Sequence, residues 1–220
     1  MDSGSFGGRF CIREMKTIRR TTVYVDGFNL YHAIDDLKKP HLKWVNLWSL
    51  AESLLKDDQT LTNVKYYSAY ARWMPDEYHR HIQYVKALEA RGVEATMSEF
   101  KERRVTCFNC GATWTKHEEK ETDVFLSADI VDDLRSDRFD VAIVITADTD
   151  IRPAINKVVA TEGKFVLVAT PPKRFGRARS LNPILSITPG RIAKNLFEQV
   201  ITNSSGGVVA ERPSHYDPPT

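Results

Sequence analysis

Short, continuous runs of apolar and β-branched residues recur along the chain and alternate with longer segments of helical periodicity. The continuous runs predict buried strands over residues 21–25, 64–71, 93–100, 141–145, 165–169 and 184–187. A run that is apolar on both faces is typical of a parallel strand covered by helices on each side. The pattern therefore predicts a parallel sheet that is buried on both faces.

Apolar residues spaced three and four positions apart predict helices between these strands. The expected helices begin at Leu30 and otherwise span residues 45–55, 75–90, 121–134, 151–161 and 191–201. Pro75 opens one of them and Gly92 ends it, as proline and glycine commonly do. Strands that alternate with helices predict an α/β fold, a three-layer α/β/α sandwich with a mainly parallel sheet.

Both ends of the chain and one internal segment lack this alternation. Residues 1–18 are glycine-containing and are expected to be a flexible N-terminal extension. Residues 203–220 are rich in Gly, Ser and Pro, which predicts a disordered tail. Residues 19–202 are expected to form one domain, within which residues 101–117 are a polar, cysteine-bearing insert.

The composition is that of an ordinary globular protein. The 220 residues are 42% hydrophobic and 27% charged, and the net charge is +2. No apolar run approaches the roughly 20 residues that cross a bilayer, so no membrane partner is expected. Three cysteines without a regular framework argue against a disulfide-stapled secreted fold. A cytoplasmic location is therefore expected.

Acidic residues follow two of the strongest predicted strands. Asp26 comes directly after residues 21–25, and Asp148 and Asp150 follow residues 141–145. Asp123 lies near the start of a predicted helix and can face the same edge of the sheet. Ligands of open α/β sheets bind outside the carboxyl ends of the strands. Carboxylates gathered there suit Mg²⁺ or Mn²⁺, which can neutralise a phosphodiester and activate water.

Each acid taken singly also has a structural explanation. Asp148 could form a turn, Asp123 could interact with the helix dipole, and Asp150 could cap the helix that begins at Ile151. The metal site is predicted from the convergence of several acids on one edge. Asp129 and Asp132 are further candidates, but an exposed helix face explains them equally well.

Three segments resemble, in order, the motifs of the NYN domain family, which has the PIN-like ribonuclease fold. They are Val25–Tyr31 (VDGFNLY), Glu119–Val124 (EKETDV) and Ile145–Asp150 (ITADTD). The resemblance spans residues 21–201. It implies a PIN-like fold, a magnesium or manganese site, and RNA as the partner.

The resemblance also implies roles for individual residues. Asp26, Asp123 and Asp148 would bind the metal, and Asp150 would complete the catalytic acids. Substrate contacts would come from Asn29, Lys120 and Thr146.

The third motif departs from the family at Ala147, where glycine is more usual. This departure puts a close phosphate approach in question if the backbone there needs a positive φ.

A basic segment follows the strand at residues 165–169. It contains Lys173, Arg174, Arg177 and Arg179, and its position after that strand predicts a phosphate-binding loop, with a solvated loop as the alternative. We expect Lys173, Arg174 and Arg177 to contact substrate.

The insert carries the sequence Cys107-Phe108-Asn109-Cys110-Gly111, which has the form of half a zinc knuckle. A structural zinc needs four ligands, so His117, Cys11 or a second chain would have to supply the others. Reduced, uncoordinated thiols on a hairpin are the alternative.

The sequence as a whole predicts a divalent-metal-dependent endoribonuclease that hydrolyses RNA phosphodiester bonds by metal-activated water. The alternative is a catalytically silent RNA-binding or regulatory module of the same fold. Retention of three acids argues against it, because a binding protein gains nothing from repelling phosphate. No nucleotide cofactor is expected, because the segment after the first strand lacks G-x-G-x-x-G. A monomer and a homodimer are both compatible with the sequence.

Overall fold

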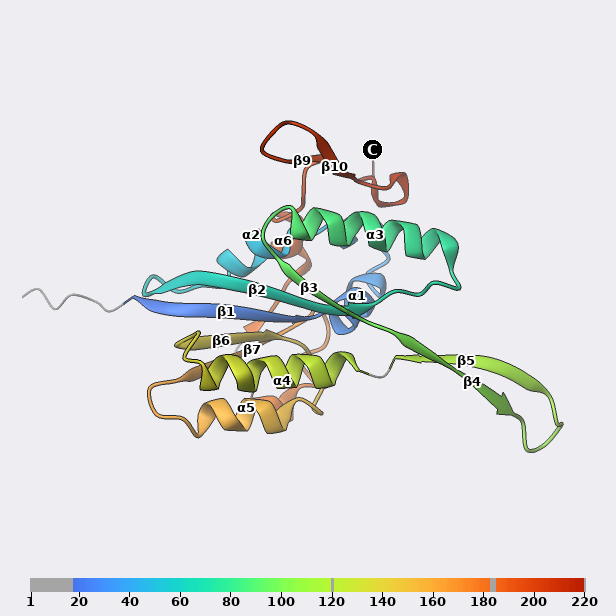
Figure 1. Ribbon diagram of the computed structural model, residues 1–220, viewed down its shortest axis with the longest axis horizontal. Coiled ribbons are helices and arrows are strands. Elements are labelled where there is room, and N and C mark those ends of the chain that lie inside the picture. The colour runs from blue at the N-terminus through green and yellow to red at the C-terminus, as the bar shows by residue number, and fades with distance from the viewer. Residues whose placement is uncertain (1–17, 120, 183–184, 220) are drawn as a thin grey trace, which may run out of the picture.

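Six parallel strands form the centre of the molecule, in the order β3-β2-β1-β6-β7-β8 (Figure 1). The computed structural model describes residues 18–119, 121–182 and 185–219. The strands are β1 (Arg19–Asp26), β2 (Gln59–Ala69), β3 (Glu94–Ser98), β6 (Val141–Ile145), β7 (Phe165–Thr170) and β8 (Leu185–Ser186). Strand β6 and residues 21–26 of β1 are buried on both faces, which is why residues 141–145 and 23–25 are continuously apolar.

Helices cover both faces of this sheet. One face carries α1 (Gly27–Asp35), α2 (Leu47–Glu52), α3 (Pro75–Glu89) and α6 (Pro189–Ala193), and the other carries α4 (Thr122–Arg135) and α5 (Arg152–Val159). Short 3₁₀ helices η1 (Pro40–Lys43) and η2 (Arg179–Leu181) lie in connections, and η3 (Ser214–Tyr216) follows β10. The predicted three-layer α/β/α sandwich with a parallel sheet is confirmed.

Alternate residues of β1 serve the two hydrophobic cores. Val23 and Val25 pack with α1, α2 and α3, whereas Tyr24 packs beneath α4. The Tyr24 hydroxyl donates a 2.7 Å hydrogen bond to Asp133 on α4. Lys65 of β2 lies 2.7 Å from the same buried carboxylate. This pairing fixes α4 against the sheet and so sets where its first turn lies.

The cysteine-bearing insert is an antiparallel hairpin. It consists of β4 (Phe100–Thr106) and β5 (Thr113–Glu119), and it projects away from the sandwich, to the right in Figure 1. Its root joins β3 on one side and α4 on the other. The insert therefore connects directly to the helix that carries Asp123.

Two expectations for the end of the chain are wrong. The helix expected over residues 191–201 is only the short α6, and the chain then enters a second hairpin, β9 (Val200–Thr202) with β10 (Val208–Glu211). The tail expected to be disordered over residues 203–220 is largely ordered in its described part. Ala210 and Tyr216 are buried in the main core, so a few apolar residues anchor a segment whose Gly, Ser and Pro form its turns.

Among the described residues, no helix has the length and hydrophobicity needed to cross a membrane.

Because Tyr216 is buried in the main core, its side chain should contribute to the stability of the fold. Its side chain is only 6% exposed. We expect Tyr216→Ala to lower the free energy of unfolding by about 3 kcal/mol, as for other buried aromatic residues. Urea denaturation followed by circular dichroism measures this change. His215→Ala, at an exposed neighbouring position, is the control. Equal midpoints for the two variants would show that the C-terminal segment is not anchored.

Candidate active site

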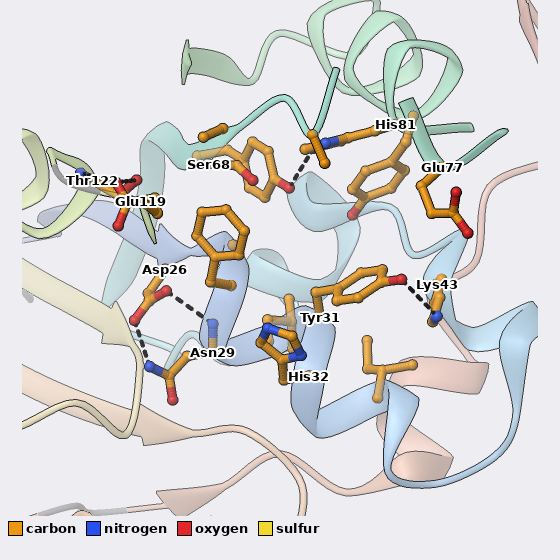
Figure 2. Close-up of a pocket in the computed structure, with 18 of the residues that line it drawn as sticks. Asp26, Asn29, Tyr31, His32, Lys43, Ser68, Glu77, His81, Glu119 and Thr122 are labelled. Atoms are coloured by element: carbon orange, nitrogen blue, oxygen red, sulfur yellow. Dashed lines mark hydrogen bonds between the residues drawn. The ribbon is translucent and has the colours of Figure 1, made fainter. Parts of the chain in front are cut away.

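Asp26 is the structural centre of the candidate site. Its buried carboxylate lies where β1 ends and α1 begins. The Asn29 backbone N–H donates to Oδ1 at 3.0 Å and the Asn29 side-chain amide donates to Oδ2 at 2.8 Å. Figure 2 shows both bonds. Asp26 is therefore the N-cap of α1, and Asn29 holds it from both backbone and side chain.

Thr146 attaches this arrangement to the neighbouring strand. Val25 and Ile145 are partners in the parallel register of β1 and β6, so the residues that follow them lie side by side. The Thr146 hydroxyl donates a 2.8 Å hydrogen bond to Asp26 Oδ2, and the Ala147 N–H donates to Asn29 Oδ1 at 3.3 Å. Asn29 and Thr146, which were expected to contact substrate, thus hold the Asp26 carboxylate in place in this structure.

Gly27 allows the chain to turn so tightly into α1. A Cβ atom at this position would lie 2.6 Å from the Tyr67 carbonyl oxygen and 2.6 Å from the Tyr66 ring. Those distances are far below van der Waals contact. The glycine of the Asp-Gly-Phe-Asn segment is therefore required by close packing of α1 on β2.

Asp148 follows β6 and faces the same cavity as Asp26 and Asp123. The Asp150 N–H donates to Asp148 Oδ1 at 2.9 Å, which makes a small turn stabilised by the aspartate side chain. Asp150 itself is exposed and is absent from the cavity wall. It does not cap α5 either, because the N-cap position is Ile151, without a side-chain bond.

Ala147 resolves the question raised by the third motif. Among the described residues other than glycine, positive φ occurs only at Lys38, Asp137, Lys173 and Asn182. The backbone at residue 147 therefore needs no glycine, and alanine is accommodated there without strain.

Glu119, at the end of β5, is a fourth acid in the cavity wall. Its Oε1 accepts hydrogen bonds from the backbone N–H groups of Glu121 (2.8 Å) and Thr122 (2.6 Å). It also accepts one from the Ser98 hydroxyl at 3.0 Å. Although burial alone would raise the pKa of Glu119, hydrogen bonds from Thr122, Glu121 and Ser98 lower it. The carboxylate caps α4 and remains charged beside the other acids.

Glu119 was not among the predicted site residues, whereas Asp129 and Asp132 were further candidates. Asp129 accepts a 2.7 Å hydrogen bond from Tyr67 and pairs with Lys65 at 3.7 Å, so it belongs to the packing beneath α4. The sequence did contain a sign of the role of Glu119, because Glu121, at the N-cap position of α4, makes no capping hydrogen bond with its side chain. An acid just upstream was a candidate to satisfy its first N–H groups.

The acids repel one another. Burial, followed by the charges of Asp26, Asp148, Glu119 and Asp150, raises the pKa of Asp123 to about 6. Burial also raises the pKa of Asp26; hydrogen bonds from Asn29 and Thr146 oppose this rise, and the charge of Asp148 adds to it. Across the described part of the chain, no lysine or arginine forms a salt bridge with Asp26, Asp123 or Asp148.

The donor chemistry fits a hard divalent cation. The described residues contain no group of three or more His, Cys, Asp or Glu side chains already arranged to enclose a metal ion. Mg²⁺ usually keeps several waters and takes only one or two carboxylates together with substrate phosphates, so such a closed group is not required. In the described part of the chain, Asp26, Asp123 and Asp148 have no lysine or arginine partner and line one cavity of about 580 Å³, and this unpaired negative charge suits such an ion.

Three of the predicted substrate-binding cations lie outside this cavity. Lys173 and Arg177 are exposed on the loop after β7, and Arg174 forms an ion pair with Asp36 at the end of α1. None of the three lines the cavity. The loop is therefore tied to α1, and Lys173 and Arg177 are left facing solvent. Lys120 lies outside the described residues.

Cys107 and Cys110 are free thiols at the tip of the β4–β5 hairpin. Backbone N–H groups of Cys110 and Asn109 lower the pKa of Cys107. His117 cannot join them, because it pairs with Glu102, four register steps below Thr106–Thr113 at the tip. At about 3.3 Å per step this separation is on the order of 13 Å. His117 instead stacks on Trp73, with ring centroids 3.7 Å apart. Cys11 lies outside the described residues.

Comparison with known proteins identifies the family. The model of the NYN domain matches residues 20–182. The chain belongs to the NYN domain family. NYN domains are generally PIN-like nucleases that act on RNA and typically use divalent metals. No curated protein matches the chain.

One solved structure shares the fold. It is a protein of unknown function from Vibrio parahaemolyticus, 16% identical, with a TM-score of 0.53. The match covers 81% of this chain and 96% of that one. At this identity the likeness concerns the NYN fold alone.

Gly27→Ala should test the close packing of α1 on β2. We expect the free energy of unfolding to fall by about 1–3 kcal/mol, because the added methyl group forces α1 away from the Tyr67 carbonyl. Gly176→Ala is the matched control, since nothing lies within 4 Å of a Cβ there. Urea denaturation that gave the same midpoint for both variants would contradict the required close approach.

Asp123→Asn should stabilise the metal-free protein at pH 8. An aspartate ionises near pH 3.9 when unfolded, but Asp123 in the folded chain has a pKa of about 6. Its contribution to stability is therefore fully present below about pH 4, is lost as pH rises to about 6, and stays lost above. Because the carboxyl is only half buried, we expect a gain of about 1–2 kcal/mol over wild type at pH 8.

The gain should nearly vanish at pH 3, where the wild-type carboxyl is largely protonated in both states. Thermal denaturation in EDTA at the two pH values measures it. Asp132→Asn, on the exposed face of the same helix, should change stability by less than about 0.5 kcal/mol. A constant difference between Asp123→Asn and wild type across this range would refute the electrostatic explanation.

Proposed function

We propose that this protein is a divalent-metal-dependent endoribonuclease that hydrolyses RNA phosphodiester bonds with water as the nucleophile. One observation carries the proposal: Asp26, Glu119, Asp123 and Asp148 come from four different segments and face one cavity. Burial, and after it the charges of the neighbouring acids, raises the pKa of Asp123, and no described cation pairs with the three aspartates. A fold that maintains such repulsion gains from it when it binds a cation.

Asp26, Asp123 and Asp148 are the residues that would hold the cation. When bound, Mg²⁺ or Mn²⁺ supplies charge neutralisation at the phosphodiester and lowers the pKa of a water molecule. Asn29 and Thr146 position Asp26 through their hydrogen bonds. Glu119 positions Asp123 by capping the helix on which Asp123 lies. Because water attacks phosphorus in place of the 2′-hydroxyl, the products carry a 5′-phosphate and a 3′-hydroxyl.

We assign substrate contacts to the surroundings of this site. Lys173 and Arg177 are exposed and suited to phosphate contacts outside the cavity, while Arg174 holds their loop to α1 through Asp36. Asp150 would act from the rim through its backbone bond to Asp148. The free thiols of Cys107 and Cys110 are compatible with a reducing cytoplasm, where we place the RNA substrate.

The alternative is an RNA-binding or regulatory module that does not cleave. The observation in its favour is that the described acids form no closed group of three metal ligands. Binding of RNA with no cleavage in Mg²⁺ or Mn²⁺ would support this alternative over the nuclease.

Cleavage of labelled RNA by wild type, Asp123→Asn and Asp148→Asn tests the proposal. We expect activity with Mg²⁺ or Mn²⁺, none in EDTA, and a loss of about 100-fold or more in each variant. Loss of one ligand that stabilises the transition state by about 3 kcal/mol has that effect. Gel electrophoresis beside 5′-phosphate and 3′-hydroxyl markers identifies the product ends.

Asp132→Asn is the matched control, because it removes an acid from the exposed face of the same helix and should retain full activity. Asn29→Ala should lower the affinity for the metal by about 10- to 100-fold, so cleavage needs a correspondingly higher metal concentration. Loss of a group that orients a metal ligand has an effect of this size. Undiminished cleavage by Asp148→Asn, or by wild type in EDTA, would overturn the metal-site proposal.

A further inference from the structure

Beyond the acids, the cavity continues as an aromatic chamber. Figure 2 shows Asp26 and Glu119 at one end, and Tyr31, Lys43, Glu77 and His81 at the other. The wall between and around them contains several aromatic rings, which include Phe28, Tyr66, Trp73, Tyr84 and Phe100. The acidic cluster is therefore one end of a larger site, and the metal chemistry leaves most of that site unused.

The first rings adjoin the acids directly. Phe28 lies two residues after Asp26 on the first turn of α1. Phe100 is the register partner of Glu119 at the root of the β4–β5 hairpin. The two rings meet edge to face, with centroids 5.7 Å apart. A phosphate held at the acids would thus have its attached nucleotide beside these rings.

An exposed ring of the chamber, Trp73, is held in place by its neighbours. Trp73 is 40% exposed. His117 of β5 stacks on it with an interplanar angle of 9°, and Phe100 meets it edge-on at 4.6 Å. Glu102 lies 3.4 Å from the His117 ring. Exposed aromatic surface that is fixed in place is typical of a binding site and not of a core.

The far end of the chamber suits an uncharged ligand. The Tyr66 hydroxyl and His81 Nε2 are hydrogen-bonded at 3.2 Å. Burial lowers the pKa of His81 to about 4, so this imidazole is neutral at physiological pH. The Lys43 ammonium is already neutralised by Asp35 at 2.7 Å. Among the described residues that line this end, the only lysine or arginine is Lys43, and because Asp35 already pairs with it, a second phosphate would find no unpaired cation there.

We infer that this chamber binds an unpaired RNA base, the one attached to the phosphodiester at the acidic end. The inference rests on the proposed action on RNA. Any of the four bases can stack on an aromatic side chain. The Watson–Crick edge of a base can also form hydrogen bonds with neutral polar groups such as His81 and Tyr66. The volume of about 580 Å³ is that of a site for a small molecule.

The chamber selects single-stranded RNA. A base in a duplex is stacked and paired, so it can enter only after it leaves the helix, which costs a few kcal/mol. The acidic end and the rings therefore have separate tasks: the acids act on the phosphate, and the chamber requires a free base next to it.

A binding experiment with Asp148→Asn in Mg²⁺ tests this inference without reliance on cleavage. The probes are a fluorescently labelled single-stranded RNA, copies with one abasic ribose placed at each position in turn, and the matched duplex. We expect weaker binding of the duplex and of copies with the abasic ribose at one or two adjacent positions. A single stacked base contributes about 1–3 kcal/mol, or roughly 5- to 150-fold in affinity.

Trp73→Ala and Phe28→Leu, each added to Asp148→Asn, should weaken binding of the intact strand by about the same factor. They should also remove most of the abasic effect, because the missing base and the missing ring belong to one contact. Trp73→Phe should restore part of the affinity. Phe108→Ala, at the fully exposed tip of the hairpin, is the control and should bind as its parent does.

Equal affinity for duplex and single strand, or abasic effects that persist undiminished in Trp73→Ala, would overturn the base-binding inference. Circular dichroism of each variant verifies that it folds, and Phe28→Leu keeps the apolar volume where alanine would not. The two proposals fail separately. If wild type cleaves RNA but the abasic effect does not depend on Trp73, the base-binding inference fails and the nuclease proposal stands. If the abasic effect depends on Trp73 but wild type does not cleave, the chamber binds a base in a protein that only binds RNA.

Discussion

The buried carboxylate of Asp26 is the constraint on which the site depends. It accepts two hydrogen bonds from Asn29 and one from Thr146, so it joins the ends of β1 and β6 to the start of α1. The parallel register brings these ends together, and Gly27 lets α1 approach β2 closely enough to complete the cap. A charge at this depth is stable only because its partners are fixed in advance. The site therefore forms only when the strand order, Gly27 and Asp26 are all present.

The acidic cluster lowers the stability of the fold, although the same cluster is what suits the site to a cation. Asp123 has a raised pKa because burial and its acidic neighbours disfavour its charge. Elsewhere the same fold neutralises its buried acids: Asp133 pairs with Lys65 and Arg138 and accepts a bond from Tyr24. The contrast separates two kinds of aspartate on α4. One faces the sheet and holds the helix in place, and the other faces the cavity without a described cation beside it.

Much of this arrangement could be predicted from the sequence because parallel strands buried on both faces have a distinctive pattern. The runs at residues 21–25 and 141–145 located the sheet and, with it, the edge that carries Asp26 and Asp148. Glu119 was missed because its role depends on where the hairpin returns to the sandwich, which no local pattern records. The chamber was missed for the same reason, since its rings come from α1, β2, α3 and the hairpin. The C-terminal segment was wrongly predicted to be disordered because its Gly, Ser and Pro content indicates turns. Composition does not show that two apolar residues, Ala210 and Tyr216, anchor the segment in the core.

Tyr216 has a second position besides its place in the core, because it also lines the chamber that begins at Asp26. The two residues are separated by most of the chain, and the packing of η3 against η1 brings them to one cavity. During synthesis the acids emerge from the ribosome long before this wall does. The sandwich can begin to form on the nascent chain, but the chamber is completed only when the C-terminal segment arrives. Because the chain is made from its N-terminus, a nascent chain would thus contain the acids before the wall of their cavity is complete.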